Sequence, residues 1–136
     1  MNDNQFVIFR LVDEYYGIKI DNVETIERIM EITRVPKTQG YIKGVINLRG
    51  EIVPIIDLRD RLGLAHKEYD SETRIIVNKN QELMIGYIVD SASEVKDIPP
   101  SAISYGTFEE NLSETFVKGI GKVENQMIII VSYIMV

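Results

Sequence analysis

Residues branched at Cβ dominate the apolar part of this chain. The 136-residue sequence contains 22 Ile and 13 Val, but only 7 Leu and 3 Ala. Branched side chains lose rotamer freedom in a helix and pack well on a pleated surface, whereas Ala and Leu are strong helix formers. We therefore expect an all-β fold, mainly strands with a few short helical turns.

Turn residues divide the apolar runs into short segments, which is typical of small barrels and sandwiches. Strands are expected at Gln5–Val12, Tyr15–Ile20, Ile26–Val35, Val45–Leu48, Glu51–Asp57, Thr73–Val77, Glu82–Val89, Val95–Ile98, Phe116–Val123 and Gln126–Ile134. Too little helix remains to cover a parallel sheet, so about ten strands in so short a chain favour two small barrels over one open sheet.

Two short helical turns are also expected. Asp21 and Glu24 have the spacing of a capping box, which predicts a turn from Asn22 to about Ile26. The second turn covers Leu58–Leu62 and would end at a glycine cap.

Charge and composition exclude several classes of function. The chain has 15 basic and 21 acidic residues, a net charge of −6, which argues against binding nucleic acid and weakly against anionic membranes. It has no Cys and a single histidine, His66 in a polar loop, so we expect no catalytic centre, no metal site and no cofactor. The longest apolar run, Met127–Val136, is too short to cross ~30 Å of hydrocarbon as a helix, and the N-terminus does not resemble a signal peptide. The sequence favours a cytoplasmic, non-catalytic protein without membrane insertion.

The segment from Gly44 to Asp57 carries a tight hairpin signal. Arg49 and Gly50 separate two apolar runs, and Gly50 is expected to take a positive φ. Pro54 inside the second run predicts an edge strand or a bulge. Asp57 and Asp90 each end an apolar strand, where a carboxylate commonly accepts hydrogen bonds from turn N–H groups. We expect structural roles in turns for Gly44, Asn47, Gly50, Pro54 and Asp57.

Arg49 at the expected hairpin tip has two interpretations. It is a solvated side chain, or a neighbouring carboxylate fixes its guanidinium so that it orders the loop or contacts a partner. The acids that could pair with it are Glu24, Glu27, Glu31 and Glu51.

The same segment resembles the CheW family of chemotaxis coupling proteins. The resemblance rests on Gly44-Val-Ile-Asn47-Leu-Arg49-Gly50 followed by Ile52-Val-Pro54-Ile-Ile-Asp57-Leu58, and it extends from about Phe6 to Ile134. Flanking matches are Tyr15-Tyr16-Gly17-Ile18, Val23 and Ile26, Val35-Pro36, Gly86-Tyr-Ile-Val-Asp90 and Gly119-Ile-Gly121.

The resemblance implies one domain over residues 1–136, made of two intertwined five-stranded SH3-like barrels. It implies an adaptor without catalytic activity, located at receptor arrays on the inner face of the membrane. Such proteins couple transmembrane chemoreceptors to the histidine kinase CheA. Their partners are the regulatory domain of the kinase and the cytoplasmic helical hairpin of the receptor.

The resemblance also implies binding residues. Val23, Arg74 and Ile75 match positions near a receptor-facing groove, and Arg49 matches an arginine that matters for coupling. For the kinase face we expect Ile26, Leu48 and Val53. The alternative for each apolar residue is plain core packing, and an exposed apolar patch would decide between the two.

Two departures from the family pattern are visible. A Glu usually follows Val23 by two residues, but Thr25 stands there, with Glu24 and Glu27 nearby. The chain stops at Val136, where many relatives continue into a helix, so Tyr133, Ile134 and Met135 would be exposed if that helix covers apolar surface.

Other interpretations stay open. The chain could be a CheW-like domain from CheA itself or from a coupling protein fused to a receiver domain, although the initial Met1 and the lack of a receiver segment favour the stand-alone form. A third interpretation is a small-ligand-binding barrel or an enzyme, and a deep polar pocket would distinguish it from the other two.

Overall fold

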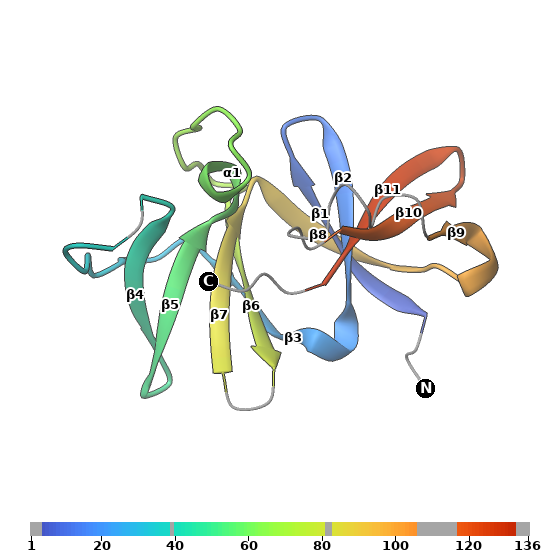
Figure 1. The fold of residues 1–136 in the computed structure, drawn as a ribbon. Coiled ribbons are helices and arrows are strands. Elements are labelled where there is room, and N and C mark those ends of the chain that lie inside the picture. The colour runs from blue at the N-terminus through green and yellow to red at the C-terminus, as the bar shows by residue number, and fades with distance from the viewer. Residues whose placement is uncertain (1–3, 39, 81–82, 106–116, 133–136) are drawn as a thin grey trace. The chain divides into compact units, whose positions relative to one another are not determined.

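The structure is a computed structural model that describes residues 4–38, 40–80, 83–105 and 117–132 (Figure 1). Its strands are β1 (Gln5–Leu11), β2 (Glu14–Lys19), β3 (Val23–Arg28), β4 (Ile42–Leu48), β5 (Glu51–Asp57), β6 (Arg74–Asn80), β7 (Leu83–Val89), β8 (Ser91–Asp97), β9 (Ile103–Ser104), β10 (Val117–Val123) and β11 (Gln126–Val131). The helical elements are a short helix, α1 (Leu58–Arg61), and the 3₁₀ turns Ile20–Asn22 and Pro100–Ala102. The predicted all-β class is confirmed. The predictions for Phe116, Tyr133, Ile134 and Met135 fall outside the described residues.

The strands form two mixed sheets rather than two sheets of five. One has six strands in the order β8-β1-β2-β11-β10-β9, with β2 and β11 parallel. The other has five strands in the order β3-β6-β7-β5-β4, with β5 and β7 parallel. The chain divides into two compact units, Met1–Val23 with Ser93–Val136, and Glu24–Ala92. The second unit is therefore inserted into the sequence of the first.

Each unit has its own apolar core. In the first, one cluster of buried side chains comprises Phe6, Ile8, Ile98, Ile128 and Ile130. In the second, a cluster comprises Ile46, Leu48, Val53, Ile55, Ile75, Val77, Met84 and Ile88. Most of these side chains are branched at Cβ, so the residues that predict strands also fill the two cores.

Backbone contacts also join edge strand β4 to the segment that follows the other edge strand, β3. Backbone hydrogen bonds of 2.8 and 2.9 Å link Thr33, in the segment after β3, to Val45 on β4. Gly44 makes this approach possible, since a Cβ there would clash with the carbonyl oxygen of Thr33. Gly44 also has a φ of 140°, which L side chains rarely adopt. Gly44 therefore has a steric role within β4, whereas the sequence predicts a role in a turn.

Three local predictions were wrong. The strand expected at Ile26–Val35 ends at Arg28, and residues 29–35 contribute only the isolated bridge at Thr33. The helical turn expected from Asn22 to Ile26 is a strand from Val23, and the 3₁₀ turn precedes it without a side-chain cap. Burial alternates along this strand with a period of two, and that pattern outweighs the capping-box spacing. Pro54 lies in an interior strand, so the edge alternative is wrong, while a register shift in the pairing of β4 with β5 lies close by, between Ile42 and Gly44. It is tolerated because the pairing of β5 with β7 begins only at Ile55.

Among the described residues, the helices are all too short to cross a membrane.

Candidate functional site

The hairpin between β4 and β5 has the predicted two-residue tip. Arg49 and Gly50 both have positive φ, 51° and 87°, as the favoured hairpin turn requires. The side-chain oxygen Oδ1 of Asn47 accepts a hydrogen bond of 2.9 Å from the Gly50 N–H. Asn47 and Gly50 therefore shape the turn from either side of Arg49, which is held in a left-handed conformation at the tip.

Arg49 pairs with one of the four predicted acids, Glu27. Its Nη2 lies 3.6 Å from Oε2 of Glu27. The same oxygen accepts a 2.7 Å hydrogen bond from the hydroxyl of Thr25, the next residue on that face of β3. The hydroxyl orients the carboxylate, and the carboxylate holds the guanidinium. Thr25 and Glu27 lie on the same face of β3, so Glu27 reaches Arg49 although position 25 holds no acid.

The guanidinium of Arg49 stays open to contact. Its side chain is 71 % exposed, whereas that of Glu27 is 22 % exposed. An exposed ion pair of this length contributes little to stability, about 0–1 kcal/mol. The geometry therefore presents an oriented, exposed cation at the hairpin tip.

The structure separates the other predicted binding residues by burial. Ile26 is exposed, and Val23 and Arg74 are half-buried. The remaining three pack in the apolar core, as the alternative interpretation expects. They are Leu48, Val53 and Ile75. Burial leaves these three almost no surface with which to contact a partner directly.

Exposed apolar surface lies instead on neighbouring positions. Ile52 is 64 % and Leu83 is 54 % exposed. Ile52 follows the hairpin tip on β5, and Leu83 is the first residue of β7. Sequence reasoning missed both residues, because each lies in a run of apolar residues in which no alternation marks the exposed face.

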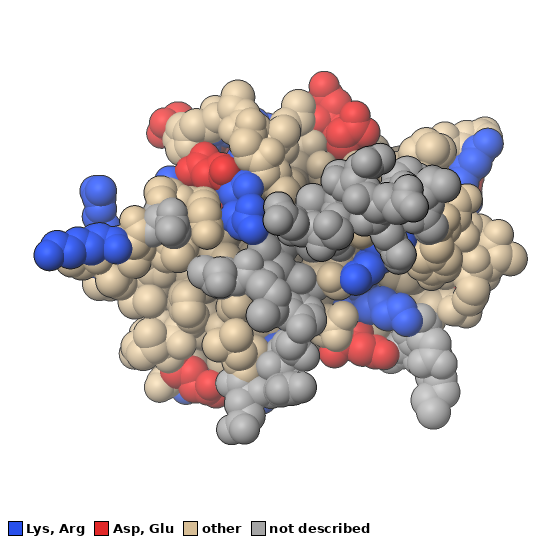
Figure 2. All heavy atoms as spheres, viewed as in Figure 1, with Lys and Arg blue, Asp and Glu red and all other residues tan. Residues whose placement is uncertain are grey.

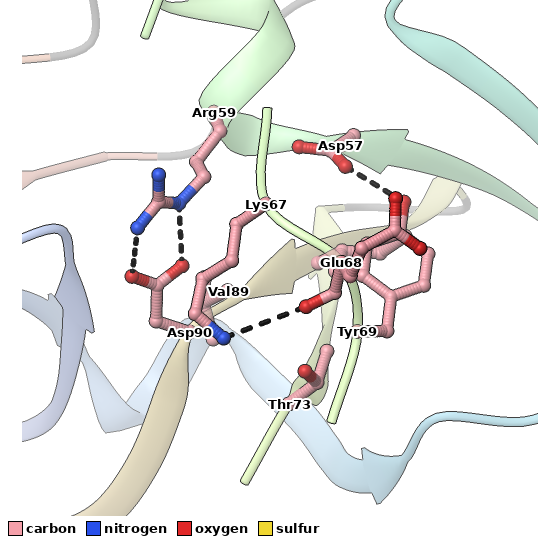
Figure 3. A pocket seen from close by; sticks show the side chains of 9 residues that line it. Asp57, Arg59, Lys67, Glu68, Tyr69, Thr73, Val89 and Asp90 are labelled. Carbon is pink, nitrogen blue, oxygen red and sulfur yellow. Dashed lines mark hydrogen bonds and ion pairs between the residues drawn. The ribbon is translucent and has the colours of Figure 1, made fainter. Parts of the chain in front are cut away.

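A second arginine–carboxylate pair lies at the other end of β5. Figure 3 shows Arg59 of α1 facing Asp90, which follows β7. Nε and Nη2 of Arg59 donate to the two carboxylate oxygens at 2.8 and 2.6 Å, and Nη1 donates to the carbonyl of Ala65 at 2.9 Å. The side chains are 13 % and 7 % exposed. This bidentate pair, hereafter the clasp, joins α1 to the end of the sheet.

Asp57 beside the clasp has the structural role predicted for it. Its Oδ1 accepts from the Asp60 N–H at the start of α1, and its Oδ2 accepts a 2.7 Å hydrogen bond from the Tyr69 hydroxyl. Burial, together with this hydrogen bond, raises the pKa of Tyr69 well above 10. The hollow between these groups has a volume of about 10 Å³, room for roughly one water. The clasp is therefore part of the fold, and the hollow beside it is too small for a substrate.

Asp57, Asp60 and His66 place one potential metal ligand atom each within 4.8 Å of one another. The carboxylates of Asp57 and Asp60 already form hydrogen bonds or ion pairs with other residues. Asp57 binds Tyr69 and the start of α1, and Asp60 lies 2.6 Å from Nζ of Lys43. His66 is 54 % exposed and faces Asp60 and Glu68 at 3.9 and 3.4 Å. These contacts describe a surface network of hydrogen bonds and ion pairs.

Comparison with known proteins gives a consistent result. The family model of the CheW-like domain matches residues 5–134. The chain is 37 % identical over 128 residues to chemotaxis protein CheW of Bacillus subtilis (strain 168), covering 93 % of this chain and 82 % of that protein. It is 34 % identical to chemotaxis protein CheW of Helicobacter pylori, covering 93 % and 76 %. The crystal structure of the scaffolding protein TtCheW from Thermoanaerobacter tengcongensis superposes with a TM-score of 0.89 at 35 % identity, covering 97 % of this chain and 90 % of that one.

Proposed function

The chain belongs to the CheW family, and from that premise we propose that it is a non-catalytic adaptor in chemotaxis signalling. It couples the cytoplasmic tip of transmembrane chemoreceptors to the histidine kinase CheA, whose regulatory domain it binds. The two compact units act together as one domain. The observation that carries this proposal is the exposed, oriented Arg49 at the hairpin tip.

The hairpin tip supports a protein-binding role for three reasons. Its backbone is fixed by a tight turn, so a partner meets a preorganised surface and pays little ordering entropy. Arg49 is exposed and anchored, and arginine is enriched at interfaces. Two apolar side chains near the tip are exposed. Ile26 lies on β3, the strand that supplies Glu27, and Ile52 lies on β5, the strand that follows the tip.

The predicted binding residues now divide into two roles. Ile26 and Arg49, with Val23 and Arg74 partly accessible, contact partners directly. Arg74 also donates to the carbonyls of Ser71 and Thr73, both at 2.9 Å, which holds its guanidinium in place. The buried side chains contribute indirectly, because they pack in the core that supports the strands carrying the exposed residues. They are Leu48, Val53 and Ile75.

The direct test is titration calorimetry of this chain with two partners. The first is the isolated regulatory domain of the CheA from the same organism, and the second is a chemoreceptor tip prepared as a helical hairpin. We expect saturable one-to-one binding to each, and the kinase domain should still bind when the receptor hairpin is already bound. Absence of binding to both, with the chain folded by circular dichroism, would overturn the proposal.

A matched control distinguishes specific from general binding. Lys79 and Lys122 are exposed lysines on β6 and β10, so Lys79→Ala and Lys122→Ala change charge without touching the hairpin tip. Both variants should bind as the wild type does. Equal weakening by these variants and by Arg49→Ala would show that net charge, rather than the tip, determines the affinity.

A further inference from the structure

A basic hollow lies on the connection between β3 and β4, away from the hairpin tip. It has a volume of about 310 Å³, and its lining residues are Arg34, Val35, Pro36, Lys37, Thr38, Gly40, Ile42 and Lys43. This lining holds three cations and no acid, on a chain whose net charge is −6. The hollow and the hairpin tip lie at opposite ends of β4, which spans about 20 Å at the usual rise per residue.

Contacts anchor the two ends of the connection, at Thr33 and at Tyr41. The hydrogen bonds between Thr33 and Val45 close its base. The carbonyl of Tyr41 accepts a 2.8 Å hydrogen bond from the Asp57 N–H, and the guanidinium of Arg61 lies 5.1 Å from the centre of the Tyr41 ring. Anchored ends limit the conformational entropy that the connection can lose when a ligand binds.

The positive charge of the hollow is largely uncompensated. Arg34 and Lys37 are exposed, and neither forms an ion pair with the residues that the structure describes. Lys43 is the exception, since its Nζ lies 2.6 Å from a carboxylate oxygen of Asp60 and its side chain is 29 % exposed. Figure 2 shows basic side chains gathered on the loop that projects beyond β4 in Figure 1. Two cations are therefore available to an anionic ligand.

We propose that this hollow binds an acidic segment of a protein partner. Carboxylates of the segment pair with Arg34 and Lys37, and an adjacent aliphatic side chain packs against Val35 and Ile42. This surface is separate from the one on which the adaptor proposal rests.

The lining favours a peptide over other anions. Val35 is 38 % exposed and lies beside Pro36 and Ile42, so part of the hollow is apolar. A free phosphate would leave that part unused, and its volume is far smaller than that of the hollow. Nucleic acids and anionic membranes present negative charge over a far larger surface than the two uncompensated cations of this hollow can match, and the rest of the chain, at a net charge of −6, repels it. A segment with both carboxylate and aliphatic side chains matches all of the lining.

The test is a nuclear magnetic resonance titration of the full-length, ¹⁵N-labelled chain. The probe is a short synthetic peptide of alternating Glu and Leu, and its control has Gln at every Glu position. We expect shifts of backbone amides concentrated between Thr33 and Lys43, with binding that weakens as salt is added. The Gln peptide should cause much smaller shifts at the same amides.

Charge reversal sharpens the test. Arg34→Glu combined with Lys37→Glu should weaken binding of the Glu peptide by about tenfold or more, because two attractive pairs become repulsive. Lys79→Glu combined with Lys122→Glu is the matched control, since it changes net charge equally at exposed sites elsewhere. The milder Lys37→Gln variant and the salt dependence of the wild type give the same answer if the doubly reversed chain fails to fold.

Several results would overturn the inference. These are equal binding of the Glu and Gln peptides, shifts that concentrate outside the connection, or equal weakening by both reversed pairs. Tighter binding of pyrophosphate or of vesicles containing phosphatidylserine at the same amides would reassign the hollow to small anions or to lipid. Loss of peptide binding while the CheA regulatory domain still binds leaves the adaptor proposal standing.

Discussion

Arg49 and Arg59 both pair with a carboxylate within the unit Glu24–Ala92, but the two pairs differ in burial and geometry. Arg59 and Asp90 make two hydrogen bonds, at 2.8 and 2.6 Å, and are 13 % and 7 % exposed. Arg49 and Glu27 approach to 3.6 Å through one contact, and Arg49 is 71 % exposed. In the clasp the guanidinium and the carboxylate are largely shielded from water and hydrogen-bond to each other. At the hairpin tip the carboxylate orients a guanidinium whose remaining donors face solvent.

The difference teaches that the residue pair alone does not fix its role. A buried pair that loses one member leaves the other charge in a poorly solvated site, which is strongly destabilising. An exposed pair that loses one member leaves a charge that water solvates. The clasp should therefore control folding, and the pair at the hairpin tip should control binding.

The largest expected effect comes from breaking the clasp. Arg59→Met removes the guanidinium from the buried carboxylate of Asp90, and the free energy of unfolding should fall by about 3–5 kcal/mol in urea denaturation. The double variant Arg59→Met with Asp90→Leu removes both charges and should recover most of that loss. A single variant as stable as the wild type would show that the clasp is not structural.

Gly50→Val should have the next largest effect. A branched residue at a φ of 87° strains the backbone, and a loss of about 1–2 kcal/mol is expected. Nothing lies within 4 Å of an added Cβ at this position, so the loss would come from the backbone alone. Gly50→Asn is the control, because Asn tolerates left-handed backbone better, and it should lose less. Equal losses in thermal unfolding would contradict this reasoning.

Arg49→Ala should change stability little, by less than about 0.5 kcal/mol. Arg and Ala both carry a Cβ, so the backbone strain at a φ of 51° is similar in the wild type and in the variant. Thermal unfolding monitored by circular dichroism measures the effect. A fall comparable to that of Arg59→Met would remove the distinction between the two pairs.

The smallest effect concerns a third ion pair, Lys67 with Asp70, whose side chains are 37 % and 51 % exposed. The hydrogen bond from Lys67, with one from the Glu72 N–H, lowers the pKa of Asp70 from 3.8 to about 2. Because the folded state favours the charged form, its stabilising contribution is present above pH 3.8 and is lost as the pH falls toward 2. A ¹³C titration of the Asp70 carboxyl should give that low midpoint, and Lys67→Met should shift it upward. An unchanged midpoint in the variant would exclude Lys67 as the cause.

The hairpin could be predicted from sequence because its determinants are local. Arg49 and Gly50 stand between two apolar runs, and the same two residues form the turn in the structure. Gly44 and Asn47 were likewise identified as turn residues, but the clash that Gly44 avoids involves Thr33, which is distant in sequence. Local chemistry thus predicted which residues matter, and only the fold supplied the reason.

Burial within the apolar runs could not be predicted. The run from Ile52 to Ile56 is apolar at every position, so no alternation distinguishes its two faces. In the structure Ile52 is 64 % exposed and the adjacent Val53 is fully buried. The clasp was also beyond sequence reasoning, because Arg59 and Asp90 are 31 residues apart and meet only through the parallel pairing of β5 with β7.

The most direct test of the account compares Arg49→Ala with the wild type in calorimetric titrations against the regulatory domain of CheA, with the melting temperature of each chain measured beside it. The account predicts clearly weaker binding by the variant at an unchanged melting temperature, since Arg49 is exposed and oriented for contact. Unchanged binding together with a lowered melting temperature would contradict it, because the pair at the hairpin tip would then be a structural element like the clasp.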